Sequence, residues 1–281
     1  MVMKALLFSQ MALSDNMAKR LILLFFVAVS CAKEDEKRPS YIALESKNDS
    51  IYVQLLNQVH STSFLEIEDK INKQTTFLDF DQPDTIYVLK FHKTEIDTTK
   101  LFQNYKFKLN YGVSSISSYD SLYNYGLPFL KGKRYKILQG QNGSFTHKGP
   151  VSRYAIDFKM NIGQDVCAIR DGLVVYVKND SNEGGRSKAY KSKANTVLVY
   201  HNDGTFSQYA HFKKDGIIVK EGDTIIKGQR IGYSGNTGQS TEPHLHFVVY
   251  KPSKDGLVSI PFILDSIPSS HYKTGKYAEN K

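Results

Sequence analysis

The sequence predicts an all-β protein. Tyr (18) and Phe (16) are abundant among its 281 residues, stretches with helical periodicity are few, and aromatic residues are typical of strands. Short runs of alternating apolar and polar side chains recur along the chain, separated by turns rich in Asn, Asp, Gly and Pro. With 41% hydrophobic residues, the chain can bury a substantial core.

Residues 1–31 are predicted to be the signal peptide of a bacterial lipoprotein. The stretch "MAKRLILLFFVAVSC", residues 17–31, begins with basic residues and continues with an apolar segment that is too short to span a bilayer. Its end, "AVSC", resembles a lipobox, which predicts a lipid on Cys31. Residues 1–16 add nothing to this signal, so we expect translation to start at Met17. The alternative is an ordinary secretory signal that happens to contain a cysteine.

Residues 32–45 are predicted to form a solvated tether. The run "AKEDEKRPS" is charged and contains proline, a composition that cannot bury an apolar core. The acidic residues after Lys33 resemble the surface-export signal of Bacteroidetes-type lipoproteins, although a plain linker has the same composition. We therefore expect a lipid-anchored protein of the cell envelope, on the periplasmic or the outer face of the outer membrane.

Two β-rich regions follow the tether. Residues 46–126 contain short alternating strands such as "SIYVQLLN" and "YKFKLNY", which predict a small β-sandwich-like accessory domain. Residues 127–268 are richer in glycine, and runs such as "NTVLVYH" and "LHFVVYK" predict an antiparallel sheet with short turns. The polar stretch near 178–195 is expected to be a long loop, and residues 269–281 a polar tail.

The charge and the cysteine content restrict the partners and the cross-links. A formal net charge of +9 suits anionic partners. The sequence contains no Arg-rich stripe with interleaved aromatics, so we expect no nucleic-acid partner. Cys167 is the only thiol besides Cys31, which excludes a disulfide framework within a lipidated chain. Its alternating apolar surroundings predict a small buried side chain.

Five polar residues of the second region are candidates for a metal site: His147, Asp157, His211, His244 and His246. In "PHLHF" the last two are separated by one residue, so a strand would project both imidazoles from one face. Asp157 lies in "YAIDF", where burying an unpaired carboxylate would be costly. Imidazole and carboxylate suit zinc, and one catalytic Zn²⁺ needs three protein ligands and an open position where water is activated. Two residues are then left for handling protons.

Three other interpretations agree less well with this pattern. The stretch "VKEGDTIIKGQRIG" resembles the hammerhead of biotin- or lipoyl-carrier modules, but it lacks the exposed carrier lysine of an M-K-M-type hairpin. A cupin would need a glutamate and a further histidine after H-x-H, and "HLHFVVYKPSKDG" offers neither. A β-domain with ordinary core histidines would need five coincidences. The remaining histidines are expected to be structural or exposed: His60, His92, His201 and His271.

Residues 127–263 resemble the M23 (lysostaphin- and LytM-like) zinc metallopeptidases. The resemblance rests on "HKGPVSRYAIDF", "VYHNDGTFSQYAHF" and "SGNTG" followed by "PHLHF", in that order. It implies an antiparallel β peptidase fold, related to the biotin/lipoyl hybrid motif, with zinc held by His147, Asp157 and His246. The same resemblance gives His211 and His244 the catalytic roles of acting on water and on the transition state.

The sequence departs from the family pattern at two points. The usual spacing is H-x-x-x-D, whereas His147 precedes Asp157 by ten residues; a hairpin through "KGPVSR" could bring the two together. Glu242 stands where a glycine commonly precedes the proline of "PHLHF", and its charge is expected to tune substrate preference. Asn195 and Tyr154 are further candidates for the substrate cleft, with a core or rim role as the alternative.

The resemblance implies a zinc-dependent metalloendopeptidase that hydrolyses peptide bonds in bacterial peptidoglycan, in its stem or cross-link peptides. Some members of the family have lost ligands and only activate other wall hydrolases, so a catalytically silent LytM-type regulator is the alternative. All five positions are occupied in this sequence, which favours the enzyme.

Overall fold

The computed structural model describes residues 41–113 and 119–281. The predicted signal peptide, the lipidation site Cys31 and most of the predicted tether lie outside these residues. No helix within the described ranges is long and apolar enough to cross a membrane. The chain divides into two compact units: the first runs up to Gln58 and includes Leu65–Phe77 and Pro83–Lys108, and the second comprises Val59–Phe64, Leu78–Gln82 and Leu109–Lys281.

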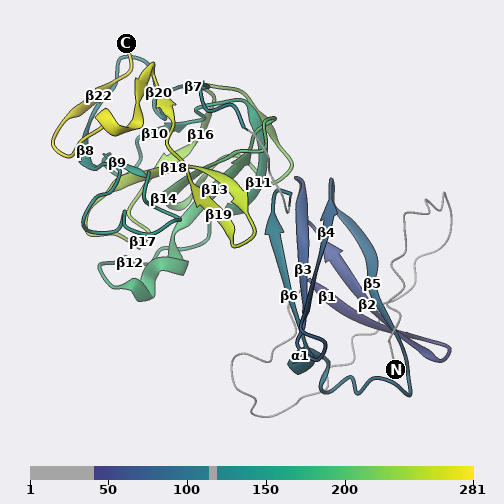
Figure 1. Cartoon of the computed structure of the whole chain (residues 1–281). Helices are drawn as coiled ribbons and strands as arrows, with labels where there is room; N and C mark the ends of the chain where they lie inside the picture. The colour runs from purple at the N-terminus through teal and green to yellow at the C-terminus, as the bar shows by residue number, and fades with distance from the viewer. Residues whose placement is uncertain (1–40, 114–118) are drawn as a thin grey trace. The chain divides into compact units, whose positions relative to one another are not determined.

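Most of two three-stranded sheets, ordered β1-β2-β5 and β4-β3-β6, belongs to the first unit (Figure 1). Phe91 packs against Tyr105 with ring centroids 5.5 Å apart, so strands from both sheets contribute to one core. The bounds are β1 (Ile42–Lys47), β2 (Ser50–Asn57), β3 (Ser63–Asp69), β4 (Gln74–Phe80), β5 (Asp84–His92), α1 (Leu101–Asn104) and β6 (Tyr105–Tyr111). β1 begins inside the predicted tether because Ile42 is buried and pairs with Leu55 of β2.

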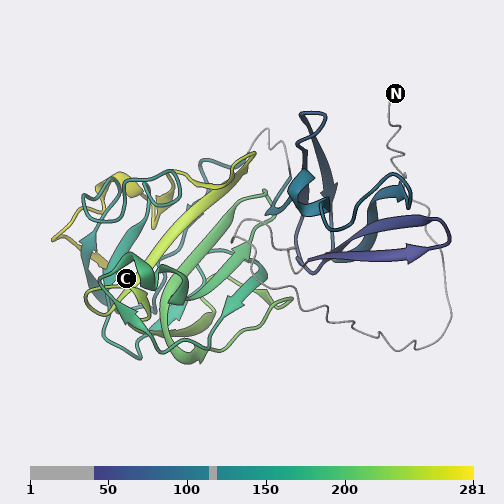
Figure 2. The same cartoon turned by 90° about the horizontal axis from the view of Figure 1, so that it is seen from below.

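The second unit is built on an 11-stranded sheet, whose main path is β15-β11-β13-β14-β18-β9-β8-β22. β16 joins this path by pairing with β14, β10 pairs with β16, and β19 pairs with β18; Figures 1 and 2 show the sheet from two directions. The bounds are β8 (Arg134–Gln139), β9 (Ile156–Lys159), β10 (Asp165–Cys167), β11 (Gly172–Lys178), β13 (Asn195–Tyr200), β14 (Phe206–Ile217), β15 (Thr224–Ile225), β16 (Arg230–Ser234), β18 (His244–Ser253), β19 (Gly256–Ser259) and β22 (Tyr277–Glu279).

Shorter elements complete the second unit. β12 and β17 form a parallel pair, and β7 pairs with β20. The bounds are β7 (Asn124–Tyr125), β12 (Gly184–Gly185), η2 (Lys188–Lys193), β17 (Gly238–Gln239), β20 (Ile263–Leu264), β21 (Ile267–Pro268) and η3 (Ser269–His271). The segment predicted to be a long loop thus contains β12 and η2 between β11 and β13.

The alternation of β18 explains why its polar residues share one face. Leu245 and Phe247 are fully buried in the main core, so the residues between them project to the opposite side of the sheet. On that opposite side, Val248 and Tyr250 belong to a smaller apolar cluster. From Leu245 to Val249, one face of β18 is therefore buried in the main core, while the opposite face changes from the two histidines to apolar side chains.

The all-β prediction is confirmed, but, besides the end of the tether, two predicted boundaries differ from the structure. Residues 269–281 are not a polar tail, because Tyr277–Glu279 form β22 and pair antiparallel with β8. Tyr272 is buried and donates a hydrogen bond from its hydroxyl to the carbonyl of Leu264. The second unit also begins before residue 127, since β7 is a strand of that unit.

Candidate metal centre

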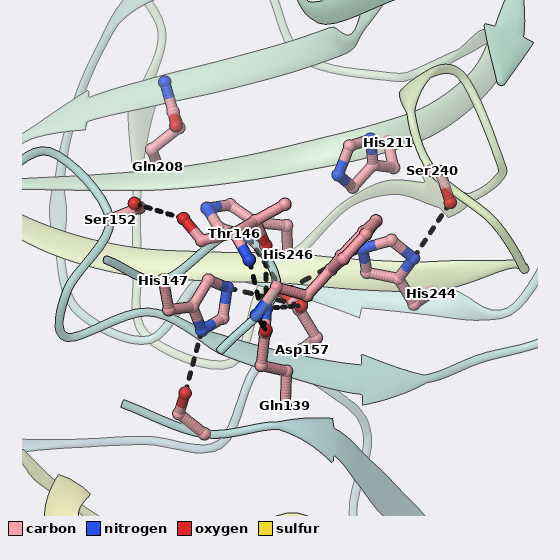
Figure 3. Close-up of polar contacts among 12 residues, drawn as sticks. Gln139, Thr146, His147, Ser152, Asp157, Gln208, His211, Ser240, His244 and His246 are labelled. Carbon is pink, nitrogen blue, oxygen red and sulfur yellow. Dashed lines mark hydrogen bonds and ion pairs between the residues drawn. The ribbon is translucent and has the colours of Figure 1, made fainter. Parts of the chain in front are cut away.

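Strands β9 and β18 place Asp157, His244 and His246 on one face of the sheet (Figure 3). In their antiparallel register, His246 is opposite Asp157 and His244 is opposite Lys159. Paired residues project to the same side, and residues i and i+2 share a face. Because the intervening Leu245 is fully buried, the apolar core fixes the side to which the polar residues point.

His147 reaches the same point from the loop between β8 and β9. Its Nε2 lies 3.3 Å from Oδ2 of Asp157, and Nδ1 of His246 lies 2.8 Å from Oδ1 of the same carboxylate. One ligand atom from each of the three residues lies within 4.8 Å of the others. The ten-residue spacing does not keep His147 away, because the loop turns back on itself: Oγ of Ser152 donates a hydrogen bond to the carbonyl of Thr146.

His211 enters the site through a β-bulge in β14. Tyr209 is fully buried in the main core and Ala210 pairs with His246, so regular alternation would point residue 211 into the core. Instead, the β13–β14 register shifts here, and His211 has a φ of 71°, a left-handed conformation that is uncommon outside glycine. The bulge turns the ring towards the other imidazoles, and its centroid lies 4.4 Å from that of His244.

Three backbone carbonyls hold the rings of His147, His211 and His244. The Nδ1 atoms of these rings lie 2.9, 2.5 and 2.8 Å, respectively, from the carbonyl oxygens of Gly140, Thr237 and Glu242. A carbonyl oxygen only accepts, so each Nδ1 carries the proton and donates it. In the neutral ring, Nε2 is then the atom with the free lone pair.

The donor set fits a zinc ion. Nε2 of His147 is buried without a hydrogen-bond partner; its 3.3 Å approach to Asp157 is an ion-pair distance without hydrogen-bond geometry. A buried lone pair of this kind is costly unless something binds to it. Two imidazole nitrogens and one carboxylate oxygen are ligands that Zn²⁺ takes in catalytic sites, where a further position stays open. His147, Asp157 and His246 are therefore the residues that would hold the ion.

Burial and the neighbouring charges act on the pKa values of the cluster in opposite directions. Burial raises the pKa of Asp157, but its contacts with His147 and His246 outweigh this effect and hold the pKa well below its usual value. Burial lowers the pKa of His147, and the carboxylate of Asp157 more than offsets this and raises it. Burial, together with the nearby imidazoles, lowers the pKa of His211 to about 3. Near neutral pH, Asp157 is thus an anion and His211 a neutral ring.

Gln139 supports both the carboxylate and the loop that carries His147. It is opposite Asp157 in the β8–β9 pair, and its amide nitrogen donates to Oδ2 of Asp157 at 3.1 Å and to Oγ1 of Thr146 at 2.7 Å. Its amide oxygen accepts from the backbone N–H groups of Phe145 and Thr146. No pattern in "RYKILQG" marks this residue, because its role depends on the strand register.

The three predicted cleft residues lie in different environments. Glu242 is partly exposed, and its carboxylate lies 3.0 Å from Nζ of Lys159. Asn195 does not line a cleft: it is fully buried, and its amide nitrogen donates to the carbonyl of Ser181, which anchors the loop before β13. Tyr154 is half-buried next to the His147 loop.

The other singled-out residues are structural or exposed, as expected. His201 is fully buried, with Nδ1 2.8 Å from the carbonyl of Asp171 and Nε2 3.0 Å from Oγ of Ser207. Cys167 is a buried free thiol. The exposed histidines are His60, His92 and His271.

Comparison with known proteins finds a family profile that covers four of the five site residues. Residues 151–257 match the profile of Peptidase family M23. A glycyl-glycine endopeptidase of Staphylococcus capitis is 37% identical over 139 residues, 49% of this chain and 31% of that protein. A peptidoglycan DD-endopeptidase of Vibrio cholerae is 41% identical over 91 residues, 32% of this chain and 18% of that protein. A murein hydrolase activator of Salmonella dublin is 35% identical over 94 residues, 34% of this chain and 22% of that protein.

Each of these alignments covers less than a third of the curated relative. Among solved structures, the catalytic domain of the antimicrobial peptidase lysostaphin from Staphylococcus simulans is 32% identical, with a TM-score of 0.33. That match covers 45% of this chain and 87% of the lysostaphin chain. The matched family segment contains Asp157, His211, His244 and His246, while His147 precedes it.

Proposed function

The chain carries a peptidase M23 domain over residues 151–257, and we propose that it is a zinc-dependent endopeptidase that hydrolyses peptide bonds in bacterial peptidoglycan. The observation that carries the proposal is the convergence of His147, Asp157 and His246, with the buried Nε2 of His147 left without a hydrogen bond. Relatives of the domain include a glycyl-glycine endopeptidase and a peptidoglycan DD-endopeptidase, which supports wall peptides as the substrate class.

The residues around the ligands prepare them for a cation. When bound, a zinc ion would polarise the scissile carbonyl and lower the pKa of water. Asp157 stays anionic and offsets part of the ion's charge, while Gln139 fixes the orientation of its carboxylate. The carbonyl of Gly140 keeps the proton of His147 on Nδ1, so Nε2 is ready to bind.

His211 and His244 would move the protons of the hydrolysis. Both rings hold their Nδ1 proton on a backbone carbonyl, so both offer Nε2 as the acceptor. One ring takes the proton that the attacking water loses, and the proton passes to the amine nitrogen as the C–N bond breaks. The ring centroids lie 4.4 Å apart, which supports a role for both rings on the same reacting atoms.

A catalytically silent regulator is the second candidate, because a murein hydrolase activator is among the relatives. A regulator that only binds the wall or another hydrolase needs neither a metal nor proton-transfer groups. The five site residues are all present and close together here, which favours the enzyme. Zinc content, combined with digestion of purified peptidoglycan, distinguishes the two.

The test compares the purified chain with three variants on isolated peptidoglycan, with mass analysis of the released fragments. Asp157→Ala and His246→Ala are expected to lose both zinc and activity, because each removes a ligand. His211→Ala is expected to retain zinc and lose most turnover. Full activity of His211→Ala would refute its catalytic role, and fragment release by a zinc-free protein would refute the metallopeptidase.

We also propose that residues 1–31 direct the chain to the cell envelope and that Cys31 carries a lipid anchor. The lipobox-like "AVSC" after an apolar segment supports this proposal. Labelled fatty acid should be incorporated into the wild-type chain and not into Cys31→Ser. Equal labelling of both proteins would show that the lipid is elsewhere.

A further inference from the structure

We infer that a pocket beside the candidate metal centre binds a carboxylate group of the substrate; the inference rests on the proposed function. The pocket has a volume of about 410 Å³ and is lined by three cationic side chains, Arg134, Lys136 and Lys159. Two tyrosines and the polar side chains of Asn161 and Gln164 also line it, and no acidic residue of the described chain does. Its chemistry therefore suits an anion.

Lys159 connects this pocket to the catalytic face. It follows Asp157 by two residues on β9 and is opposite His244 on β18, so its side chain projects from the same side of the sheet as the metal ligands. Two residues of a strand span about 7 Å. When a peptide binds with its scissile bond at the metal centre, a side chain one or two residues from that bond can therefore contact Lys159.

Strand pairing and aromatic stacking hold the residues around the pocket in place before a ligand binds. β22 pairs with β8, with Tyr277 opposite Lys136, and the guanidinium of Arg134 lies 4.2 Å from the ring centroid of Tyr277. The hydroxyl of Tyr135 donates to Oε1 of Gln164 at 2.9 Å. Stacking restricts the guanidinium before any ligand arrives, which lowers the entropy lost on binding.

Glu242 shows which group this site accepts. Its carboxylate lies 3.0 Å from Nζ of Lys159, and both side chains are about half exposed, 45% and 51%. The negative charge of Glu242 is therefore balanced by Lys159, with which the glutamate forms an ion pair. An exposed pair of this kind is worth little in free energy, so a substrate carboxylate can replace it with little loss.

Peptidoglycan stem peptides supply the required ligand. Their glutamate and diamino-acid residues carry carboxylates that some cell walls retain and others convert to amides. A carboxylate near the scissile bond would replace Glu242 on Lys159 and face Arg134 and Lys136 behind it, whereas an amide would bring no negative charge to any of the three cations. The subsite thus makes the chain selective for cross-links with free carboxylates over amidated ones.

The test uses two synthetic cross-linked stem peptides that differ only in whether these carboxylates are free or amidated. Turnover and binding of both peptides are measured with the wild-type chain, Lys159→Gln and Lys254→Gln. Lys254 is an exposed lysine in the turn after β18, about 30 Å along that strand from His244, and serves as the matched control. We expect Lys159→Gln to reduce kcat/KM about 10-fold for the free-carboxylate peptide and hardly for the amidated one, and Lys254→Gln to change neither.

Glu242→Gln provides the complementary measurement, because it frees Lys159 and should tighten binding of the free-carboxylate peptide only. Equal losses of Lys159→Gln on both peptides, or no loss on either, would overturn the subsite while leaving the proposed hydrolysis intact. Binding that depends on Lys159 and on the free carboxylate, but without cleavage, would support the subsite and refute the hydrolase. Binding of neither peptide by the wild-type chain would refute both.

Discussion

Replacing Gln139 with alanine tests how strongly the environment of the ligands determines metal affinity. The substitution removes the hydrogen bond to Oδ2 of Asp157 and the hydrogen bond to Thr146, and it takes away the acceptor of the Phe145 and Thr146 backbone N–H groups. The carboxylate and the loop that carries His147 therefore lose their shared support.

The magnitude follows from the bond to the charged carboxylate. A hydrogen bond to a charged group contributes about 1.5–3 kcal/mol, and each 1.4 kcal/mol corresponds to about a tenfold change in an equilibrium constant. Loss of this bond should weaken zinc binding by about 10- to 100-fold, which is the range found for partners of metal ligands. Because the loop that carries His147 is weakened as well, the loss of zinc affinity should lie towards the upper end of this range.

Competition with a chromophoric chelator measures the zinc Kd of the wild-type chain and of the variant. Gln208→Ala is the matched control, because Gln208 is a half-buried glutamine on β14 whose Oε1 accepts from the hydroxyl of Tyr250 at 3.0 Å. A zinc Kd of Gln139→Ala within a factor of two of wild type would refute the reasoning. An equal weakening in Gln208→Ala would show that general destabilisation, and not support of Asp157, is responsible.

Three further substitutions test other parts of the structure. Asp203→Ala leaves the buried guanidinium of Arg170 without its 2.9 Å partner and should lower the free energy of unfolding by about 3 kcal/mol in urea titrations; a loss below 1 kcal/mol would be inconsistent with a buried pair. Burial lowers the pKa of His201 to about 4, so the unfolded chain binds this proton first as the pH falls below about 6.5. Stability is then lost between about pH 6.5 and 4, by up to about 3 kcal/mol, and His201→Gln should lack this part of the loss; identical pH profiles would contradict it. At Gly140, a methyl group would overlap the carbonyl of Tyr272, so Gly140→Ala should shift the carbonyl that holds His147 and weaken zinc binding, as the same chelator competition would show.

The period of the strands predicted part of the site from the sequence. The i, i+2 spacing of His244 and His246 required a common face, and the structure has that arrangement because Leu245 is buried on the other side. Asp157 was selected for a similar local reason, as a carboxylate within an apolar strand. Both inferences depend only on neighbours in the chain.

The orientation of the His211 side chain cannot be predicted from its neighbours in the chain. By alternation its side chain would follow Tyr209 into the core, and only the bulge with a left-handed backbone turns it into the site. The bulge lies in the pairing of β14 with β13, and the ring is held by the carbonyl of Thr237, 26 residues along the chain. The sequence made this residue a candidate within a strand-like stretch, but only the resemblance to a known family gave it a catalytic role.

Long-range strand pairing accounts for the remaining differences. Residues 269–281 were predicted to be a polar tail because β8, the strand with which β22 pairs, lies far upstream in the sequence. Asn195 was a candidate for the substrate cleft, but its amide donates to the carbonyl of Ser181 and holds the loop before β13 from inside. Gln139 was not selected at all, because a glutamine opposite a ligand is recognised only once the register is known.

The central claim is that His147, Asp157 and His246 hold a zinc ion that the chain needs to cleave wall peptides. The most direct measurement is the zinc content per chain, by elemental analysis of protein purified without chelators, together with fragment release from peptidoglycan by the same preparation. We predict about one zinc per wild-type chain with cleavage, and loss of both in Asp157→Ala. A wild-type chain that cleaves without zinc, or an Asp157→Ala chain that retains both metal and cleavage, would contradict the claim.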